Sequence, residues 1–269
     1  MTGVLLVGCG KMGGALLEGW RKNKAADRFI VIEPMEAFVA HLIGVEGVTV
    51  VGDVSAVPAD FKPDAIVMAV KPQSMAAAAP PFAGLAASSV TLSIAAGMPI
   101  SFFEAAFGKD AAIVRAMPNT PAAIGMGMSV LCANAATTDV QRTLSDTLMQ
   151  AAGVVDWIQD EDLMDAVTAL SGSGPAYVFH LIEAMAAAGE ALGLSPELAA
   201  KLALQTVAGA GELARTAVED PGTLRQNVTS PAGTTAAALN VLMADPGQRE
   251  LMTRAMTAAR DRGRELAKG

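Results

Sequence analysis

The sequence predicts an α/β protein, with a doubly wound, mostly parallel sheet over residues 1–158 followed by an all-α domain over residues 159–269. Three observations predict this class. Short, continuous apolar runs recur through the first part, a glycine-rich turn follows the first of these runs, and strand signals stop after about residue 160. Alternation of such runs with helical segments is typical of a parallel sheet covered by helices.

The predicted strands are runs without the alternation of a half-exposed strand, which indicates burial on both faces. They lie at residues 4–7, 29–32, 48–51, 65–70, 90–94 and 112–114. Between the first two, Ala15, Leu16, Leu17 and Trp20 recur at helical spacing. This segment is the crossover helix expected of a βαβ unit.

Three capping signals predict helices in the second part. Ser173-Gly174-Pro175, Ser195-Pro196-Glu197 and Asp245-Pro246 each place a helix-capping residue before a proline that fits a first turn. The domain is rich in alanine and poor in aromatic side chains, so its core would be small. We expect burial against a second copy of the chain, and the alternative is a helical cap folded onto the sheet.

Composition excludes several classes of protein. The chain has 269 residues, a net charge of −8, 52% hydrophobic and 17% charged residues, which rules out intrinsic disorder. A pI near 4.8 argues against a nucleic-acid or anionic membrane partner. The uncharged stretch 72–103 is divided by proline and glycine into pieces too short for a membrane span. Cys9 and Cys132 fit neither a disulfide framework nor a metal site, so we expect a cytoplasmic protein without a metal.

The glycine-rich turn reads Gly8-Cys9-Gly10-Lys11-Met12-Gly13, a G-x-G-x-x-G motif. It follows a predicted strand, opens a predicted helix, and is followed by Glu33 at the end of the next strand. This context is the dinucleotide fingerprint of Rossmann-type domains. The first glycine permits the turn, the second admits the pyrophosphate, and the third packs helix on strand. Cys9 is interpreted as a small filler whose pKa a nearby helix start could lower.

Glu33 predicts which nicotinamide cofactor is preferred. A carboxylate can accept hydrogen bonds from the ribose hydroxyls of NADH, whereas it would repel the 2′-phosphate of NADPH. The following residues, Pro34, Met35 and Glu36, offer no phosphate ligand. We therefore expect NADH or NADPH as cofactor, with NADH favoured. The alternative is that Glu33 points into solvent.

Five further blocks resemble the pyrroline-5-carboxylate reductase family. They are Ala69-Val70-Lys71-Pro72, Ser93-Ile94-Ala95-Ala96-Gly97, Arg115-Ala116-Met117-Pro118-Asn119-Thr120-Pro121, Ser171-Gly172-Ser173-Gly174-Pro175-Ala176-Tyr177 and Asn227-Val228-Thr229-Ser230-Pro231-Ala232-Gly233-Thr234-Thr235. The resemblance spans nearly the whole chain. It implies reduction of the cyclic imine 1-pyrroline-5-carboxylate to L-proline, the last step of proline biosynthesis. It also implies a homodimer formed through the helical domain, often assembled further into a decamer.

The resemblance also implies roles for particular residues. Thr235 would be catalytic, facing the ring nitrogen, while Ser230, Gly233 and Thr234 would surround the substrate carboxylate and Glu161 would approach the substrate across the dimer interface. Cofactor contacts are implied at Val70, Lys71, Ala96, Asn119 and Asn227, besides the glycine-rich turn. Helix capping is the alternative role for the threonines, and a solvated surface acid is the alternative for Glu161. Ala232 departs from the usual Ser-Pro-Gly-Gly and requires a compatible backbone angle.

Two alternative functions stay open at this stage. One is a related imine reductase or β-hydroxyacid dehydrogenase, although the helical domain lacks the motif around the catalytic lysine that such dehydrogenases use. The other is a nucleotide-sensing protein without turnover.

Overall fold

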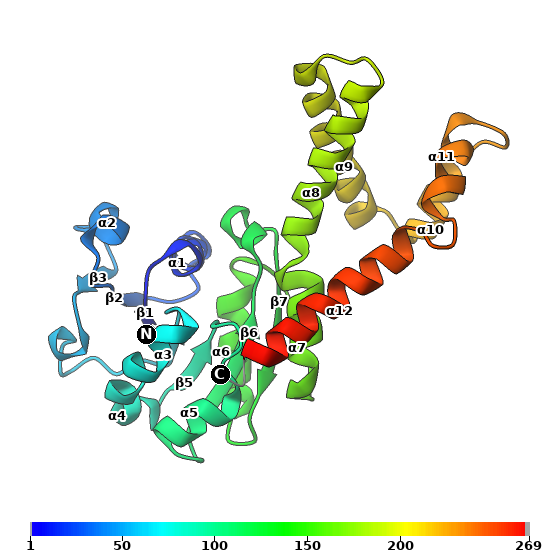
Figure 1. Ribbon diagram of the computed structural model, residues 1–269. Helices are drawn as coiled ribbons and strands as arrows, with labels where there is room; N and C mark the ends of the chain where they lie inside the picture. Colours follow the sequence, from blue (N-terminus) through cyan, green and yellow to red (C-terminus); the bar gives the residue numbers. More distant parts are fainter. Residues whose placement is uncertain (1, 267–269) are drawn as a thin grey trace. The chain divides into compact units, whose positions relative to one another are not determined.

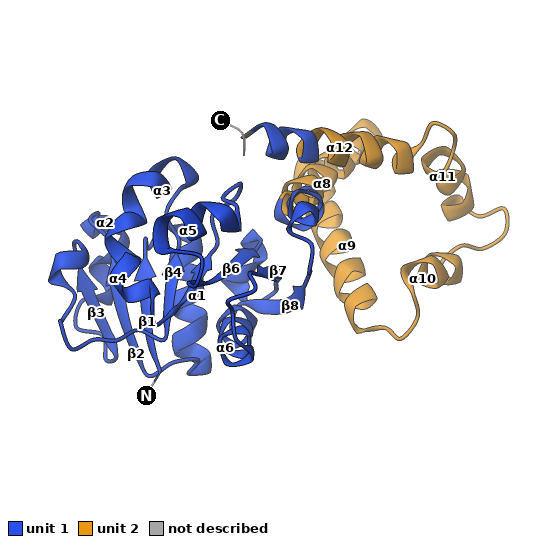
Figure 2. Ribbon diagram, turned by 90° about the horizontal axis from the view of Figure 1, so that it is seen from below, with its two compact units in different colours: residues 1–172, 260–269 blue, residues 173–259 orange. Residues whose placement is uncertain are grey.

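The computed structural model describes residues 2–266, and the chain forms two compact units (Figure 2). Unit 1 comprises Met1–Gly172 and Arg260–Gly269, and unit 2 comprises Ser173–Ala259. The predicted functional boundary after residue 158 stays a prediction. The boundary between the compact units falls later in the chain, after Gly172, because residues that follow the last strand, such as Met164, pack on the sheet.

Unit 1 is built on an eight-stranded sheet (Figure 1). Its strands are β1 (Gly3–Val7), β2 (Arg28–Ile32), β3 (Val48–Val51), β4 (Ala65–Met68), β5 (Val90–Ser93), β6 (Ala112–Met117), β7 (Gly127–Ala133) and β8 (Gly153–Trp157). Their order is β3-β2-β1-β4-β5-β6-β7-β8, and only the β6–β7 pair is antiparallel. The predicted doubly wound, mostly parallel sheet is confirmed.

The strand boundaries differ from the predicted ones at functionally important ends. β4 ends at Met68, so Ala69 and Val70 lie beyond the strand, although the amide of Ala69 still donates to the carbonyl of Val7 at 2.8 Å. Neither β7 nor β8 is among the six predicted strand runs, although Met126 and Met128 around the start of β7 were interpreted as strand core. β8 is a short edge strand with alternating half-buried and exposed residues, which gives little apolar signal.

Helices cover both faces of the sheet. They are α1 (Lys11–Asn23), α2 (Glu36–Val39), α3 (Pro72–Ala78), α4 (Ala83–Ala86), α5 (Ile100–Phe107), α6 (Asp139–Gln150) and α7 (Met164–Val167). Side chains of α1, α2 and α6 pack in one core cluster, and those of α3, α4, α5 and α7 pack in the other.

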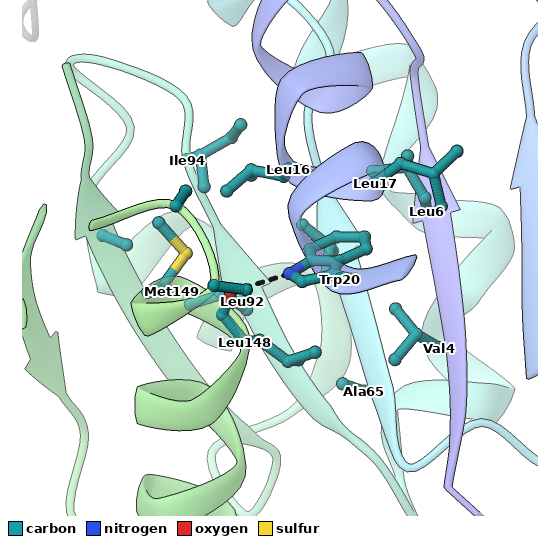
Figure 3. Close-up of a cluster of buried hydrophobic side chains, with 14 of the residues drawn as sticks. Val4, Leu6, Leu16, Leu17, Trp20, Ala65, Leu92, Ile94, Leu148 and Met149 are labelled. Atoms are coloured by element: carbon teal, nitrogen blue, oxygen red, sulfur yellow. Dashed lines mark hydrogen bonds between the residues drawn. The ribbon is translucent and has the colours of Figure 1, made fainter. Parts of the chain in front are cut away.

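Trp20 anchors the first cluster, shown in Figure 3. It is fully buried beside Leu16, and its indole N–H donates to the carbonyl of Leu148 at 2.7 Å. This hydrogen bond satisfies the one polar atom of a large buried side chain and joins α1 to the end of α6. The helix that carries the glycine-rich turn is thereby fixed against the sheet.

Unit 2 contains α8 (Gly174–Ala191), α9 (Pro196–Thr216), α10 (Pro221–Asn227), α11 (Thr234–Leu242) and most of α12 (Gln248–Leu266). The predicted start at Ser195 is confirmed, since its hydroxyl accepts from the amide of Leu198 at 3.3 Å. Within the described part of unit 2, Ala199 and Ala203 are the only buried residues. Phe179, Leu192 and Val218 are exposed by 60%, 86% and 101%. Unit 2 therefore has almost no apolar core within one chain.

Candidate functional site

A cavity of about 1020 Å³ opens in unit 1 at the carboxyl ends of β1, β2, β4 and β5. Strand order reverses direction between β1 and β4, and ligands of open α/β sheets bind in the crevice at such a point. Eight predicted cofactor residues line this cavity: Gly8, Gly10, Lys11, Met12, Glu33, Val70, Lys71 and Ala96. The fold thus gathers residues that are distant in sequence around one crevice.

Each glycine of the turn has a distinct structural requirement. Gly8 has φ +92°, and an added Cβ would lie 2.9 Å from the carbonyl oxygen of Ala69. At Gly13 an added Cβ would collide with the carbonyl oxygen of Gly8. At Gly10, which lines the cavity, an added Cβ meets no atom within 4 Å. The first and third glycines are needed by the fold, and the second leaves room on the cavity side, as a bound pyrophosphate requires.

Two alanine variants should separate these roles. Gly13→Ala is expected to destabilise unit 1 by about 1–3 kcal/mol, because the contact is with backbone that must shift. Gly10→Ala is expected to leave Tm unchanged and to weaken NADH binding. Thermal unfolding and a fluorescence titration with NADH measure the two effects. Equal Tm losses in both variants would contradict this assignment.

The start of α1 is electrostatically suited to an anion. Gly10 is the N-cap and provides no side-chain cap, and the first turn contains no acidic residue. Its first-turn N–H groups and the positive end of the helix dipole are therefore available to phosphate oxygens. Together with the open space at Gly10, this arrangement fits a dinucleotide.

Glu33 is held in place rather than directed freely into solvent. One carboxylate oxygen accepts from the amide of Cys9 at 2.8 Å, and the other accepts from the amide of Met35 at 3.0 Å. The half-buried carboxylate lines the cavity beside the turn. Each oxygen keeps a second lone pair, which could accept from a ribose hydroxyl.

The thiol of Cys9 behaves differently from the prediction. The side chain is buried, and burial, reinforced by the Glu33 and Glu18 carboxylates, raises its pKa to about 11. The expected lowering by the helix start is wrong, because desolvation and neighbouring negative charge outweigh it. The interpretation of Cys9 as a small filler is consistent with its burial.

The β4 side of the cavity contains Val70 and Lys71. Lys71 is the N-cap of α3 and is exposed, with Pro72 at the first helical position. Ala96 lies on the β5 side, just before Gly97, whose φ of +74° turns the chain toward α5. These residues form walls at the ends of two neighbouring strands.

Sequence reasoning missed the apolar wall at the β2 and β3 ends. Met35 and Phe38 line the cavity and are 55% and 43% exposed, and Val54 lines it as well. The available sequence signal was the pair of large apolar residues shortly after β2 and Glu33, since a flat adenine ring binds well between apolar groups.

Asn119 does not line this cavity, and both ends of its amide are used internally. Its Nδ2 donates to the carbonyl of Ser171 at 3.1 Å, and its Oδ1 accepts from the amide of Met128 at 2.9 Å. Ser171 lies in a π-helical turn, Thr168–Gly172. Asn119 therefore joins two of the motifs that carry the family resemblance, and its cofactor contact stays a prediction.

Glu161 is paired within unit 1. One oxygen, Oε1, accepts from Arg115 Nη1 at 2.8 Å and from the amide of Ile100 at 2.9 Å. The same carboxylate adds to the rise that burial produces in the pKa of the Cys132 thiol. The alternative of a merely solvated acid does not describe this residue, and its substrate contact stays a prediction.

The predicted substrate loop lies in unit 2, between α10 and α11. Asn227 ends α10 and is exposed, and Gly233 is the N-cap of α11. No side chain caps this helix, and Thr234 and Thr235 are its first two residues. The helix-capping alternative for these threonines is therefore wrong, and the first-turn N–H groups are open to a carboxylate.

The departure at Ala232 has the expected backbone consequence. Its φ is +58°, in the left-handed region, which costs an L-residue about 1–2 kcal/mol. The next residue, Gly233, lies so close to Ser230 that an added Cβ would collide with the Ser230 hydroxyl. The tight turn thus brings Ser230 and the start of α11 together.

Among the described residues, 2–266, no group of three or more His, Cys, Asp and Glu side chains could hold a metal ion. Among the helices of that same range, none is long and apolar enough to cross a membrane.

Comparisons with known proteins place this arrangement in a family. Residues 161–266 match the profile described as pyrroline-5-carboxylate reductase dimerisation, and residues 3–97 match that of NADP oxidoreductase, coenzyme F420-dependent. The chain is 41% identical to the pyrroline-5-carboxylate reductase of Pseudomonas aeruginosa, covering 98% of this chain and 96% of the relative. Identity to that of Synechocystis is 39%, covering 98% and 97%.

Solved structures agree with the sequence relatives. A pyrroline-5-carboxylate reductase from Coxiella burnetii superposes with a TM-score of 0.91 at 34% identity, covering 98% of this chain and 97% of that one. A Plasmodium falciparum pyrroline carboxylate reductase with NADP bound gives 0.81 at 28% identity, covering 99% and 98%. The chain belongs to the pyrroline-5-carboxylate reductase family.

Proposed function

We propose that this protein reduces 1-pyrroline-5-carboxylate to L-proline, the last step of proline biosynthesis. The observation that carries the proposal is the cavity of unit 1, lined by the glycine-rich turn and Glu33, in a chain that matches pyrroline-5-carboxylate reductases over nearly its whole length. A bound NAD(P)H supplies the hydride that adds to the C=N carbon, and the ring nitrogen takes up a proton.

The preferred cofactor is NADH. The two amides that hold Glu33 place its negative charge on the wall of the cavity, at the end of β2. Rossmann-type domains bind the adenosine ribose at this position. A 2′-phosphate there would meet a like charge, whereas ribose hydroxyls would meet an acceptor.

The substrate carboxylate binds at the start of α11, to Ser230, Gly233 and Thr234. The uncapped first turn offers N–H donors to the carboxylate, and the Thr235 hydroxyl donates to the ring nitrogen. Thr235 is half-buried at the second position of α11. A neutral hydroxyl is a weak acid, so water is the ultimate proton source.

The active protein is a homodimer that buries the apolar surface of unit 2. The exposed side chains of Phe179, Leu192 and Leu202 are supporting observations, because a helical unit with so little internal core requires a partner. The match to a dimerisation profile over residues 161–266 also supports it. A higher oligomer such as a decamer stays a prediction.

Dimerisation through unit 2 is tested by Leu202→Glu. This change places a charge on an apolar side chain of α9 that is 49% exposed within one chain. Sedimentation velocity is expected to show a dimer for the wild type and a shift to monomer for the variant. Glu197→Gln, on the same helix, is the control and should leave the dimer intact.

The catalytic function is tested with purified protein, NADH and 1-pyrroline-5-carboxylate. Loss of absorbance from the reduced nicotinamide with matching formation of proline is the expected result. Tight NADH binding without turnover would instead favour a nucleotide sensor. Turnover only of other imines or of β-hydroxyacids would favour the related reductases.

We expect the protein in the cytoplasm, where its two free, buried cysteines stay reduced.

A further inference from the structure

We propose that Glu161 is a positioning residue that fixes the nicotinamide end of the cofactor cavity by anchoring the segment between β5 and α5. The proposal rests on the proposed nicotinamide cofactor. It gives Glu161 a different role from the substrate contact that the family resemblance implies.

The anchor is a carboxylate oxygen with two donors. Glu161 Oε1 accepts from the amide of Ile100 at 2.9 Å and from Arg115 Nη1 at 2.8 Å. The Arg115 side chain is 9% exposed and that of Glu161 is 28% exposed. A guanidinium this buried requires a paired anion, so Arg115 on β6 holds the carboxylate at this position.

Ile100 is the first residue of α5, and the segment before it forms part of the cavity wall. Ile94, Ala95 and Ala96 line the cavity, and the segment starts from a β-ladder bond in which the amide of Ile94 donates to the carbonyl of Met68 at 3.1 Å. The bond to Glu161 fixes the other end of the segment.

Between these two ends the segment has little hydrogen bonding of its own. The amide of Met98 donates to the carbonyl of Ala95 at 3.4 Å, and that of Ala95 to the hydroxyl of Ser93 at 3.4 Å, which are both long. Gly97 turns the chain with a φ of +74°. Ile94, Ala95 and Ile100 are also packed in the core, so loss of the Glu161 bond leaves mainly side-chain packing to hold the α5 end of the wall.

Sheet order indicates which part of the cofactor this wall contacts. Glu33 at the end of β2 marks the adenosine ribose, and β5 lies on the opposite side of the β1–β4 crevice. A dinucleotide that spans the crevice therefore places its nicotinamide half near residues 94–96. ADP-ribose, which lacks the nicotinamide ring, would bind without needing this wall.

The test compares NADH with ADP-ribose in Glu161→Ala. Titrations by fluorescence and calorimetry are expected to show NADH affinity lowered about tenfold and ADP-ribose affinity unchanged within about twofold. Asp162→Ala is the matched control, since Asp162 is the exposed neighbouring acid, and it should change neither affinity. Glu161→Gln keeps an oxygen for the Ile100 amide and should retain most of the NADH affinity.

A double variant separates the anchor from the buried charge. Glu161→Ala leaves Arg115 unpaired and could lower stability, whereas Arg115→Met with Glu161→Ala removes that charge. Under the proposal the double variant regains Tm but keeps the weakened NADH binding, since the bond to Ile100 is still absent. It also provides a folded protein if the single variant does not fold.

Three outcomes would overturn the proposal. Equal losses of NADH and ADP-ribose affinity would indicate a general structural role, and restored NADH affinity in the double variant would trace the effect to the charge of Arg115. Wild-type protein that binds neither ligand would refute the cofactor site and this proposal with it. Wild-type protein that binds NADH but forms no proline would refute the proposed reaction and leave the role of Glu161 in cofactor binding intact.

Discussion

Replacing Thr235 by alanine is expected to lower kcat/KM for 1-pyrroline-5-carboxylate by about a hundredfold. The hydroxyl lies at the second residue of α11, where it does not cap the helix, and is proposed to donate to the imine nitrogen. A positioned proton donor contributes about 10²–10⁴ in rate, and a hydroxyl of high pKa belongs at the lower end. Steady-state kinetics with saturating NADH measure the effect.

The control for this variant is cofactor binding. Because the glycine-rich turn and Glu33 belong to unit 1, the Kd for NADH should be the same in Thr235→Ala as in the wild type. Thr235→Ser keeps the hydroxyl and should retain most activity. Full activity in the alanine variant would remove Thr235 from the mechanism.

Wild-type protein is expected to show at least about a tenfold higher kcat/KM with NADH than with NADPH, and Glu33→Gln should remove most of this preference. At about 4 Å and an effective dielectric of about 20, a like charge costs on the order of 4 kcal/mol before screening. Solvent and salt reduce this repulsion at a half-buried carboxylate to about 1–2 kcal/mol. A difference of that size corresponds to about a tenfold or larger difference in kcat/KM between the two cofactors.

Glu36→Gln is the matched control for Glu33, since Glu36 is an exposed acid in the first turn of α2 and does not line the cavity. Glu36→Gln removes one negative charge, as Glu33→Gln does, and should leave the ratio of kcat/KM with NADH to that with NADPH unchanged. Equal or better kcat/KM with NADPH in the wild type would contradict the role given to Glu33.

Features encoded in a few adjacent residues were predicted from the sequence. The six predicted runs form strands because each is short and mostly apolar, with at least two β-branched residues in every run. The glycine-rich turn was recognised because its neighbours, a strand and a helix, are also local. β8 was missed because an edge strand with an exposed side carries little apolar signal.

Roles that depend on distant partners required the tertiary structure. Asn119 looks like a polar ligand in a turn after a strand, yet its amide is hydrogen-bonded to Ser171 and Met128. Glu161 stands in an acidic run that suggests a solvated face, and only its contact with the buried Arg115, far away in sequence, reveals an ion pair. The thiol pKa of Cys9 likewise depends on burial and on Glu33.

The sequence by itself determined the doubly wound sheet, the helical second part and the residues of the dinucleotide turn, because local patterns of burial and backbone freedom specify them. Tertiary structure decided which polar groups face the cavity and which are used internally. The physical reason is that a side chain's hydrogen-bond partners and desolvation are set by residues brought together only when the sheet forms.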